Sequence, residues 1–169
     1  GGLESFERAT ERVYDGCKIL FVPWICDDNQ EHTFETVKKT DALYCFGHLE
    51  LGGFQMYKGL PSHGGMDRSV FNKFDLVCSG HYHHRSRDGN VQYLGAAMEY
   101  TWSDYDDPRG FAVFDTDTGE LEFVDSPVKI FEKAFYDDSV SQDIDSIDFA
   151  RFKDKIVKVV IKKIGRAHV

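Results

Sequence analysis

The sequence predicts an α/β fold, and three observations support this prediction. The chain has 169 residues, of which 41% are hydrophobic and 14% aromatic, which is enough for one domain with a real core. Short, nearly continuous apolar runs recur along it, as is typical of strands buried on both faces. Short segments with helical features separate these runs. A strand–helix–strand–helix–strand order followed by a meander favours an α/β sandwich over an all-β barrel.

The first half of the chain contains two of these strands and one helix. A strand-like segment near the start is followed by CKILFVPWI (17–25), which predicts a buried strand. EHTFETVKKT (31–40) predicts a short helix, because its entry is acidic, its end carries lysines, and Phe34 and Val37 are spaced i,i+3. DALYCFGHLE (41–50) predicts another short strand, which Gly47 ends.

The second half predicts a third buried strand and then a meander. DRSVFNKF (67–74) indicates one or two helical turns capped by Asp67, and it leads into the strand DLVCSG (75–80). NVQYLGAAM (90–98) predicts a strand, and GFAVFDTDTGELEFV (110–124) predicts a hairpin with Thr-Gly at its turn. KIFEKAFY (129–136) and IVKVVIKK (156–163) indicate further strands on either side of an acidic, Ser-rich boundary at 137–148.

Composition excludes several classes of protein. The net charge of −9 argues against a surface that coats nucleic acid generically, so any DNA must be held locally or through metal ions. Cys17, Cys26, Cys45 and Cys78 occur singly, without a CxxC motif, which indicates reduced thiols in a reducing compartment. No apolar run is long enough to span a bilayer, so we expect no membrane association.

Two glycine–histidine pairs carry the strongest functional signal. Gly47-His48 follows the apolar run LYCF, and Gly80-His81 follows LVCS. Open α/β sheets place ligands beyond the carboxyl ends of their strands. His81 and His83 are two residues apart and can point the same way in an extended chain. A polar turn would explain one such pair, but two of them, one continuing as GHYH, favour metal binding. Imidazole alone does not distinguish manganese, iron and zinc.

These motifs also carry a family resemblance. GHLE (47–50) and GHYH (80–83), with PWICDDN (23–29), GFQMYKG (53–59) and YLGAAMEYTWSDYDDPRGFAVFD (93–115), resemble the calcineurin-like metallophosphoesterase superfamily. Within it, the chain resembles the DNA double-strand-break repair nucleases of the SbcD type, most of all the recombination endonuclease subunits of T-even bacteriophages. The resemblance covers nearly all of residues 14–136.

The resemblance implies a metal-dependent DNA nuclease. Such a site holds two divalent ions, usually manganese, and His48 and His81 would bind one ion while His83 binds the other. The implied architecture is a four-layer α-β-β-α sandwich, and the implied activity is exonuclease and endonuclease cleavage of DNA in recombination and repair. The implied partners are DNA and an SMC-like coiled-coil ATPase, and a homodimer is compatible with the family. The implied location is the cytoplasm of a bacterium or of a phage-infected host.

Three motifs of the family are absent from this sequence. They are Asp-x-His, Gly-Asp-x-x-Asp and Gly-Asn-His-Asp, which supply the bridging aspartate, an asparagine ligand and the histidine general acid. We therefore expect residues 1–126 to be the C-terminal half of a nuclease domain truncated at its N-terminus. Residues 127–163 would begin a DNA-binding or capping domain. Residues 164–169 resemble a translated sequencing adapter and are expected to be a non-native tail, the alternative being a frayed natural terminus.

Other residues leave both a structural and a functional interpretation open. His84 is expected to be a non-ligand, His32 a helix-surface residue, Trp24 a core residue, and Glu50 a solvated side chain rather than a neighbour of the metal ligands. Candidates for DNA contact in the loops near the site are Lys58, His63, Arg85, Arg87, Tyr100, Trp102 and Arg109.

Two alternatives to the nuclease remain at this point. The chain could belong to another calcineurin-like phosphoesterase that acts on phosphoproteins or nucleotides, or to a non-enzymatic scaffold with a degenerate phosphoesterase fold. The long segment after GHYH favours the nuclease, and the retained histidines argue against degeneration.

Overall fold

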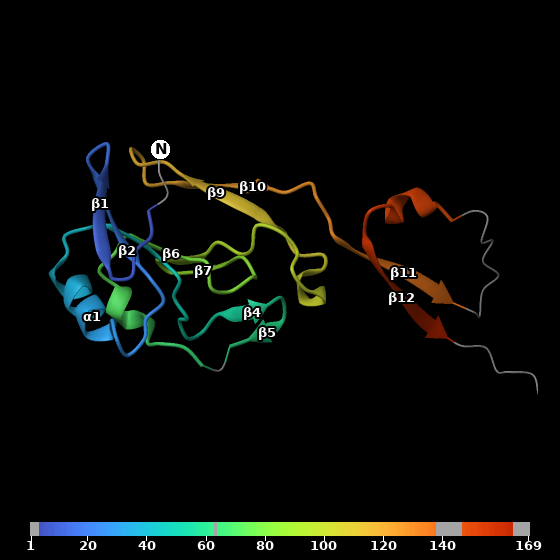
Figure 1. Ribbon diagram of the computed structural model, residues 1–169, viewed down its shortest axis with the longest axis horizontal. Coiled ribbons are helices and arrows are strands. Elements are labelled where there is room, and N and C mark those ends of the chain that lie inside the picture. The colour runs from blue at the N-terminus through green and yellow to red at the C-terminus, as the bar shows by residue number, and fades with distance from the viewer. Residues whose placement is uncertain (1–3, 63, 138–146, 164–169) are drawn as a thin grey trace, which may run out of the picture.

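The computed structural model describes residues 4–62, 64–137 and 147–163, and its centre is a mixed six-stranded sheet (Figure 1). The strand order is β1–β2–β3–β6–β8–β7. The four inner strands are parallel: β2 (Cys17–Val22), β3 (Tyr44–Gly47), β6 (Leu76–Ser79) and β8 (Val91–Tyr93). The edge strands β1 (Thr10–Tyr14) and β7 (Ser86–Asp88) run antiparallel to their neighbours. The predicted α/β class is confirmed.

Both predicted helical segments lie in the connections between parallel strands. The helix α1 (Gln30–Lys39) joins β2 to β3, and the 3₁₀ turn η1 (Arg68–Phe71) lies between β3 and β6. The Asp67 carboxylate accepts a hydrogen bond from the Ser69 N–H at 2.9 Å, which confirms the predicted cap. Figure 1 shows α1 and η1 together at one side of the sheet.

The main core fills the space between the sheet and these helical segments. Val37 of α1 and Phe71 of η1 are 1% and 0% exposed and pack with residues from the inner strands. The strand residues in this cluster are Leu20, Val22, Cys45, Val77, Val91 and Tyr93. Because each buried apolar side chain contributes about 1.5–3 kcal/mol, this cluster holds the inner strands in register.

The other face of the sheet carries a row of aromatic rings. Phe46 of β3 lies edge-on between Phe21 of β2 and Phe114, with centroid distances of 6.1 and 5.0 Å. Phe114 belongs to the hairpin of β9 (Gly110–Phe114) and β10 (Leu121–Asp125), which confirms the predicted hairpin. Phe114 also lies 4.9 Å from the Tyr44 ring, and Gly119 in the turn packs against the same tyrosine, so the hairpin contacts β3 through Phe114 and through its turn.

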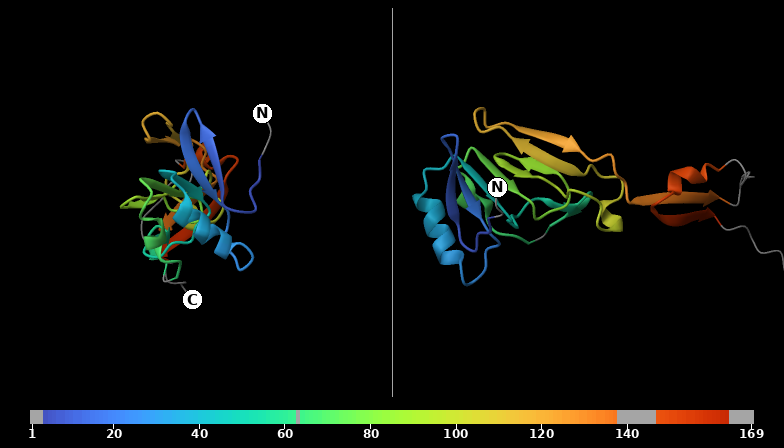
Figure 2. Two further views of the ribbon diagram at one scale, coloured as in Figure 1. Left: turned by 90° about the vertical axis from the view of Figure 1, so that its left-hand side faces the viewer. Right: turned by 45° about the horizontal axis from the view of Figure 1, so that its top comes forward.

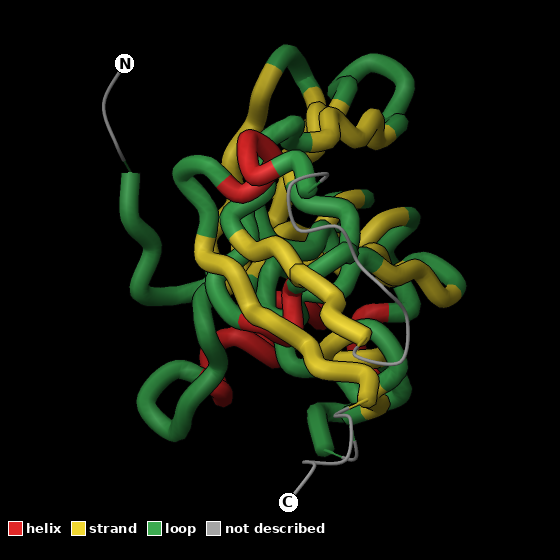
Figure 3. The backbone as a smooth tube through the Cα atoms, turned by 90° about the vertical axis from the view of Figure 1, so that its right-hand side faces the viewer, coloured by secondary structure: helices red, strands yellow, loops and turns green. Residues whose placement is uncertain are grey.

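The last two strands form a separate two-stranded sheet. β11 (Phe131–Asp137) pairs in parallel with β12 (Ile156–Lys163), and the 3₁₀ turn η4 (Phe149–Phe152) precedes β12. Figures 1 and 2 show this pair projecting beyond the six-stranded sheet, to which a single segment after β10 connects it, and Figure 3 views the molecule from the end at which the pair lies. The strands predicted at 129–136 and 156–163 are confirmed.

The structure differs from the sequence predictions at several boundaries. The strand predicted over 17–25 ends at Val22, because Pro23 has no N–H for the ladder. The strand predicted over 90–98 ends at Tyr93, and Gly95 then turns the chain with a φ of +77°. Strand β7 and the small hairpin of β4 (Gln55–Tyr57) and β5 (Leu60–Pro61) were not predicted. Of the helices in the described ranges, none combines the length and apolarity that crossing a bilayer requires.

Candidate metal centre

His48 and His81 follow adjacent parallel strands, as predicted, and the backbone around them is fixed by hydrogen bonds. The His48 N–H donates to the Val22 carbonyl at 3.2 Å, and the Gly80 N–H donates to the Gly47 carbonyl at 3.3 Å. The buried Ser79 hydroxyl accepts from the Leu49 N–H and donates to the Leu49 carbonyl, both at 2.9 Å. The ends of β3 and β6 are thereby tied together directly behind the two histidines.

The two glycines that precede these histidines serve different purposes. A Cβ on Gly47 would lie 2.6 Å from the Val22 carbonyl oxygen. The close packing of β3 against β2 therefore requires glycine at position 47. A Cβ on Gly80 would meet nothing within 4 Å. Gly80, by contrast, borders open space.

The rings of His48 and His81 meet. Nε2 of His48 is 3.2 Å from Nδ1 of His81, and the ring planes are nearly perpendicular. Burial lowers the pKa of His81, and the neighbouring His48 lowers it further, since two cations this close would repel each other. Both effects favour the neutral imidazole, which is the form that binds metals.

Two other side chains border this pair. The indole of Trp24 lies 5.2 Å from the His81 ring and 5.9 Å from the His48 ring, and it is 47% exposed. The expectation that Trp24 is a core residue is therefore wrong. A Glu50 carboxylate oxygen is 3.8 Å from Nε2 of His81, and the Glu50 side chain is 40% exposed. Glu50 is thus both solvated and adjacent to a predicted ligand.

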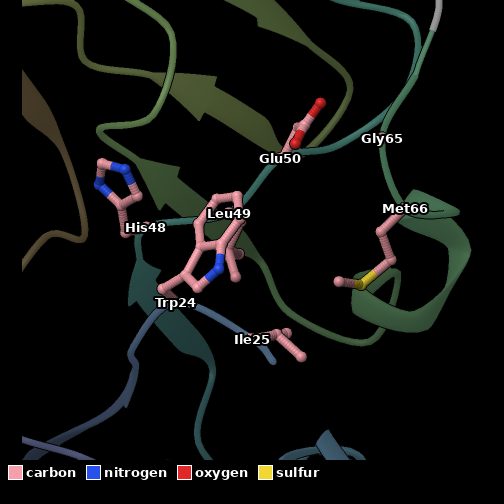
Figure 4. A pocket seen from close by; sticks show the side chains of 7 residues that line it. All are labelled: Trp24, Ile25, His48, Leu49, Glu50, Gly65 and Met66. Carbon is pink, nitrogen blue, oxygen red and sulfur yellow. The ribbon is translucent and has the colours of Figure 1, made fainter. Parts of the chain in front are cut away.

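A cavity of about 250 Å³ opens beside His48 (Figure 4). In Figure 4 the Trp24 indole lies at the centre, with His48 to one side and Met66 to the other. The lining residues are Trp24, Ile25, His48, Leu49, Glu50, Gly65 and Met66. Most of these side chains are apolar, so the cavity wall beside His48 is largely apolar.

His83 and His84 each pair with a buried aspartate from the loop after β8. Nδ1 of His83 is 3.1 Å from Asp104, and Nδ1 of His84 is 3.0 Å from Asp107. Asp104 is the last residue of the 3₁₀ turn η2 (Trp102–Asp104) and forms a capping box with Thr101. His83 also lies close enough to His81 to lower the pKa of His81 slightly.

Arg109 connects the two histidine–aspartate pairs. Its Nη2 donates to Asp104 and to Asp107, both at 3.1 Å, and its Nη1 donates to the His83 carbonyl. The Arg109 side chain is only 1% exposed. The guanidinium is therefore enclosed by protein and is not presented to a phosphate, unlike the DNA contact expected of it.

The other candidates for DNA contact are placed in several different ways. Arg85 is engaged by Asp125 at 2.7 Å and stacks on Phe123, so its charge is already paired. Lys58 and Arg87 are exposed, and Lys58 donates to the Asp106 carbonyl at 3.3 Å.

Tyr100 is 57% exposed, and its ring is 5.7 Å from that of His83. Trp102 packs on Phe131 at 4.7 Å. His63 lies outside the described residues, as do residues 164–169.

Asp104 and Asp107 were not recognised from the sequence. Their signal was the acidic run SDYDDPR (103–109), in which a single arginine follows three carboxylates. Within residues 4–62, 64–137 and 147–163, no group of three or more His, Cys, Asp or Glu side chains is arranged to hold a metal ion. In the described part of the chain, the rings of His48 and His81 therefore meet, and an aspartate orients each of His83 and His84.

Comparison with known proteins gives one informative match. No family model matches the chain. The chain is 34% identical to exonuclease subunit 1 of Enterobacteria phage T4 over 164 residues, which are 97% of this chain and 47% of the T4 protein. It thus spans about half the length of the relative it matches. The resemblance to phage nuclease subunits inferred from the motifs is confirmed: over nearly its whole length, the chain is similar to about half of a phage exonuclease subunit.

Proposed function

We propose that this chain is part of a metal-dependent DNA nuclease subunit that hydrolyses phosphodiester bonds in recombination and repair. One observation carries the proposal: two histidine rings converge at the ends of adjacent parallel strands, in a chain similar to a phage exonuclease subunit. That similarity also favours a nuclease over a phosphoprotein or nucleotide phosphatase and over a non-enzymatic scaffold.

The histidine pair fits a shared metal ion. Two imidazole nitrogens that each lie about 2.0–2.1 Å from one zinc ion are about 2.8–3.4 Å apart at coordination angles from about 90° to about 109°, and the slightly longer bonds to manganese shift this range only a little. The observed separation of 3.2 Å lies within that range. His48 and His81 would hold one ion and His83 a second, and we propose manganese for both. When bound, the ions would supply Lewis-acid stabilisation of the phosphate and a water of lowered pKa.

The remaining ligands are part of the proposal. The three family motifs that are absent from the sequence would supply a bridging aspartate, an asparagine and a general-acid histidine from a preceding segment. With those groups absent, the chain by itself should bind manganese weakly, in the high micromolar range or weaker. The aromatic face around Phe21, Phe46 and Phe114 would pack against that segment in a four-layer α-β-β-α sandwich.

The wider assignment follows the same resemblance. Residues 1–126 would be the C-terminal half of the nuclease domain and residues 127–163 the start of a capping domain, which the separate β11–β12 sheet supports. An SMC-like ATPase would be the partner, with DNA as the substrate. The whole would act in the cytoplasm of a bacterium or an infected host, where that DNA lies.

Manganese titration of the chain tests the proposed site without requiring activity. Mn²⁺ broadens the nuclear magnetic resonances of nearby protons even when binding is weak. We expect the ring signals of His48, His81 and His83 to broaden first. His32, which is exposed on α1, is the internal control. Equal broadening of His32 and the three predicted ligands would contradict a metal site here.

A second test concerns cleavage in a longer protein that includes the missing motifs. His83→Ala should abolish manganese-dependent DNA cleavage and leave the thermal unfolding midpoint nearly unchanged, because the His83 side chain is 31% exposed. His32→Ala is the matched control and should keep full activity. Cleavage by the His83 variant at the wild-type rate would remove His83 from the site.

A further inference from the structure

The carboxylate of Asp104 is completely enclosed and fully hydrogen-bonded. Its side chain is 0% exposed. One oxygen, Oδ1, lies 3.1 Å from both His83 Nδ1 and Arg109 Nη2. The other oxygen, Oδ2, accepts from the backbone N–H groups of Tyr100 and Thr101, both at 2.8 Å. The carboxylate is therefore fixed from both sides by groups of its own loop.

The other partners of this carboxylate can only donate hydrogen bonds. They are the guanidinium of Arg109 and the backbone N–H groups of Tyr100 and Thr101. A carboxylate surrounded by such donors acts as an acceptor. The His83 atom that faces it, Nδ1, must therefore carry the proton. In the neutral ring this leaves the lone pair on Nε2.

We propose that Asp104 is a positioning residue: by accepting the Nδ1–H of His83 it fixes the ring's tautomer and orientation, so that Nε2 is the atom offered to a metal ion. This inference rests on the proposed function for the identity of the ligand, but not for the tautomer. Metal-bound histidines commonly donate their second ring nitrogen to a carboxylate, and losing that partner typically costs about 10–100-fold in metal affinity. Arg109 donates to the same oxygen, and the N–H groups of Tyr100 and Thr101 hold the other oxygen in place.

The neighbouring His84–Asp107 pair provides a control within the same molecule. It has the same chemistry, a ring Nδ1 at 3.0 Å from a buried carboxylate, and the same arginine contacts that carboxylate at 3.1 Å. If Asp104 acts on His83 specifically, removing the charge of Asp107 should alter the His84 ring and leave the His83 ring unchanged.

The tautomers can be read directly from the metal-free chain. Long-range ¹H–¹⁵N correlation spectra at about pH 8, above the ordinary histidine pKa of about 6.5, distinguish protonated from unprotonated ring nitrogens. We expect the wild-type His83 to show a protonated Nδ1 and a bare Nε2. Asp104→Asn should shift His83 toward the opposite tautomer, Asp107→Asn should shift only His84, and the exposed Asp106→Asn should shift neither.

The wild-type spectrum alone can overturn the inference, even if a variant of the buried Asp104 fails to fold. A His83 ring protonated on Nε2 would mean that Asp104 does not select the tautomer. Amide spectra of Asp104→Asn and Asp106→Asn show whether each variant keeps the native fold.

Manganese titration of the same samples distinguishes the positioning role of Asp104 from the proposed metal site itself. If Mn²⁺ broadens the ring signals of the wild-type histidines and Asp104→Asn needs at least about tenfold more Mn²⁺ for the same effect at His83, the positioning role is supported. If both chains respond equally, Asp104 is not a positioning residue, and the proposed metal site still stands. If the wild-type rings do not respond at all while the tautomers behave as expected, the proposed function fails instead.

Discussion

At the scale of single residues, the four cysteines differ in how far the fold encloses them. Cys45 and Cys78 lie on neighbouring inner strands and are 0% and 2% exposed, whereas Cys26 is exposed. Burial raises the pKa of Cys45, with a further contribution from Cys78, and raises the pKa of Cys78 to about 12. Because the thiolate is the reactive form, the two buried thiols should be inert in the folded chain.

Thiol titration with a disulfide reagent checks this expectation. We expect one fast reaction at Cys26, a slower one at the half-buried Cys17, and reaction of the last two thiols only when denaturant is added. Cys26→Ser should remove the fast phase alone. Rapid reaction of four thiols in native buffer would contradict the described packing of β3 and β6.

The two glycines before the histidines form a matched pair for mutation. In Gly47→Ala the new methyl group would overlap the Val22 carbonyl, and overpacking of this kind costs about 1–3 kcal/mol. In Gly80→Ala the methyl group meets nothing within 4 Å, so the free energy of unfolding should change little. Chemical denaturation of both variants measures the difference. Equal destabilisation by the two substitutions would show that the strand ends are packed differently.

The contact between the His48 and His81 rings could be predicted from the sequence, whereas the contact between Asp104 and His83 could not. Two buried strands that run parallel must end at the same edge of the sheet, so residues that follow them are neighbours wherever the helices go. Asp104 reaches His83 only because η2 and its capping box bend the loop after β8 back onto the site. No periodicity encodes such a bend. His–Asp pairing across 21 residues depends on the folded loop alone.

At the scale of elements, the turn between β9 and β10 depends on Asp115. Its carboxylate accepts hydrogen bonds from the N–H groups of Thr118 and Asp117 at 2.9 and 2.8 Å, and these contacts lower its pKa. A carboxylate with a lowered pKa stabilises the fold above its unfolded pKa of about 3.9, and this contribution disappears as the pH falls through the folded value.

Asp115→Asn tests this contribution because it removes the charge and keeps an acceptor. The wild type should be more stable than the variant at pH 7, and the difference should shrink as the pH falls below about 4. Thermal unfolding of both chains across this pH range gives the comparison. Asp117→Asn is the control, since the turn uses the backbone N–H of Asp117 rather than its carboxylate. A difference that grows at acidic pH would mean that the sign of the Asp115 contribution is wrong.

The turn between β1 and β2 is made by Asp15 and Gly16, whose residue types favour a hairpin. Asp15 and Gly16 both have positive φ, 48° and 85°, as a two-residue type I′ turn requires. The Asp-Gly dipeptide directly precedes the apolar run CKILFV and is a strong hairpin signal. By contrast, the sequence of β7, Ser-Arg-Asp, has no strand propensity. This segment is a strand because it pairs with β8.

At the scale of the whole molecule, the outer face of the β9–β10 hairpin carries exposed apolar side chains beside Glu122. Phe111 is 60% exposed, and its cross-strand partner Val124 is 40% exposed, with Val113 on the same face. Such patches promote association. We expect the chain to self-associate as its concentration rises and Phe111→Lys to reduce this. His32→Lys, on the surface of α1, is the charge-matched control. Sedimentation velocity over a concentration series provides the measurement. Equal self-association of the two variants would mean that the chain associates through a different surface.

The position of β6 in the sheet has a kinetic consequence for the histidines that follow it. All four residues of β6 are buried, and the strand has β3 on one side and β8 on the other. Its amides should therefore exchange with deuterium only when the whole sheet opens, whereas those of the two-stranded β11–β12 sheet should exchange through local openings. Hydrogen exchange followed by mass spectrometry would measure both rates, and faster exchange in β6 would contradict this order. Because the chain passes from β6 to His81 through a single glycine, the histidines are attached to the segment that opens last. Heat or denaturant should then disperse them in one step with global unfolding.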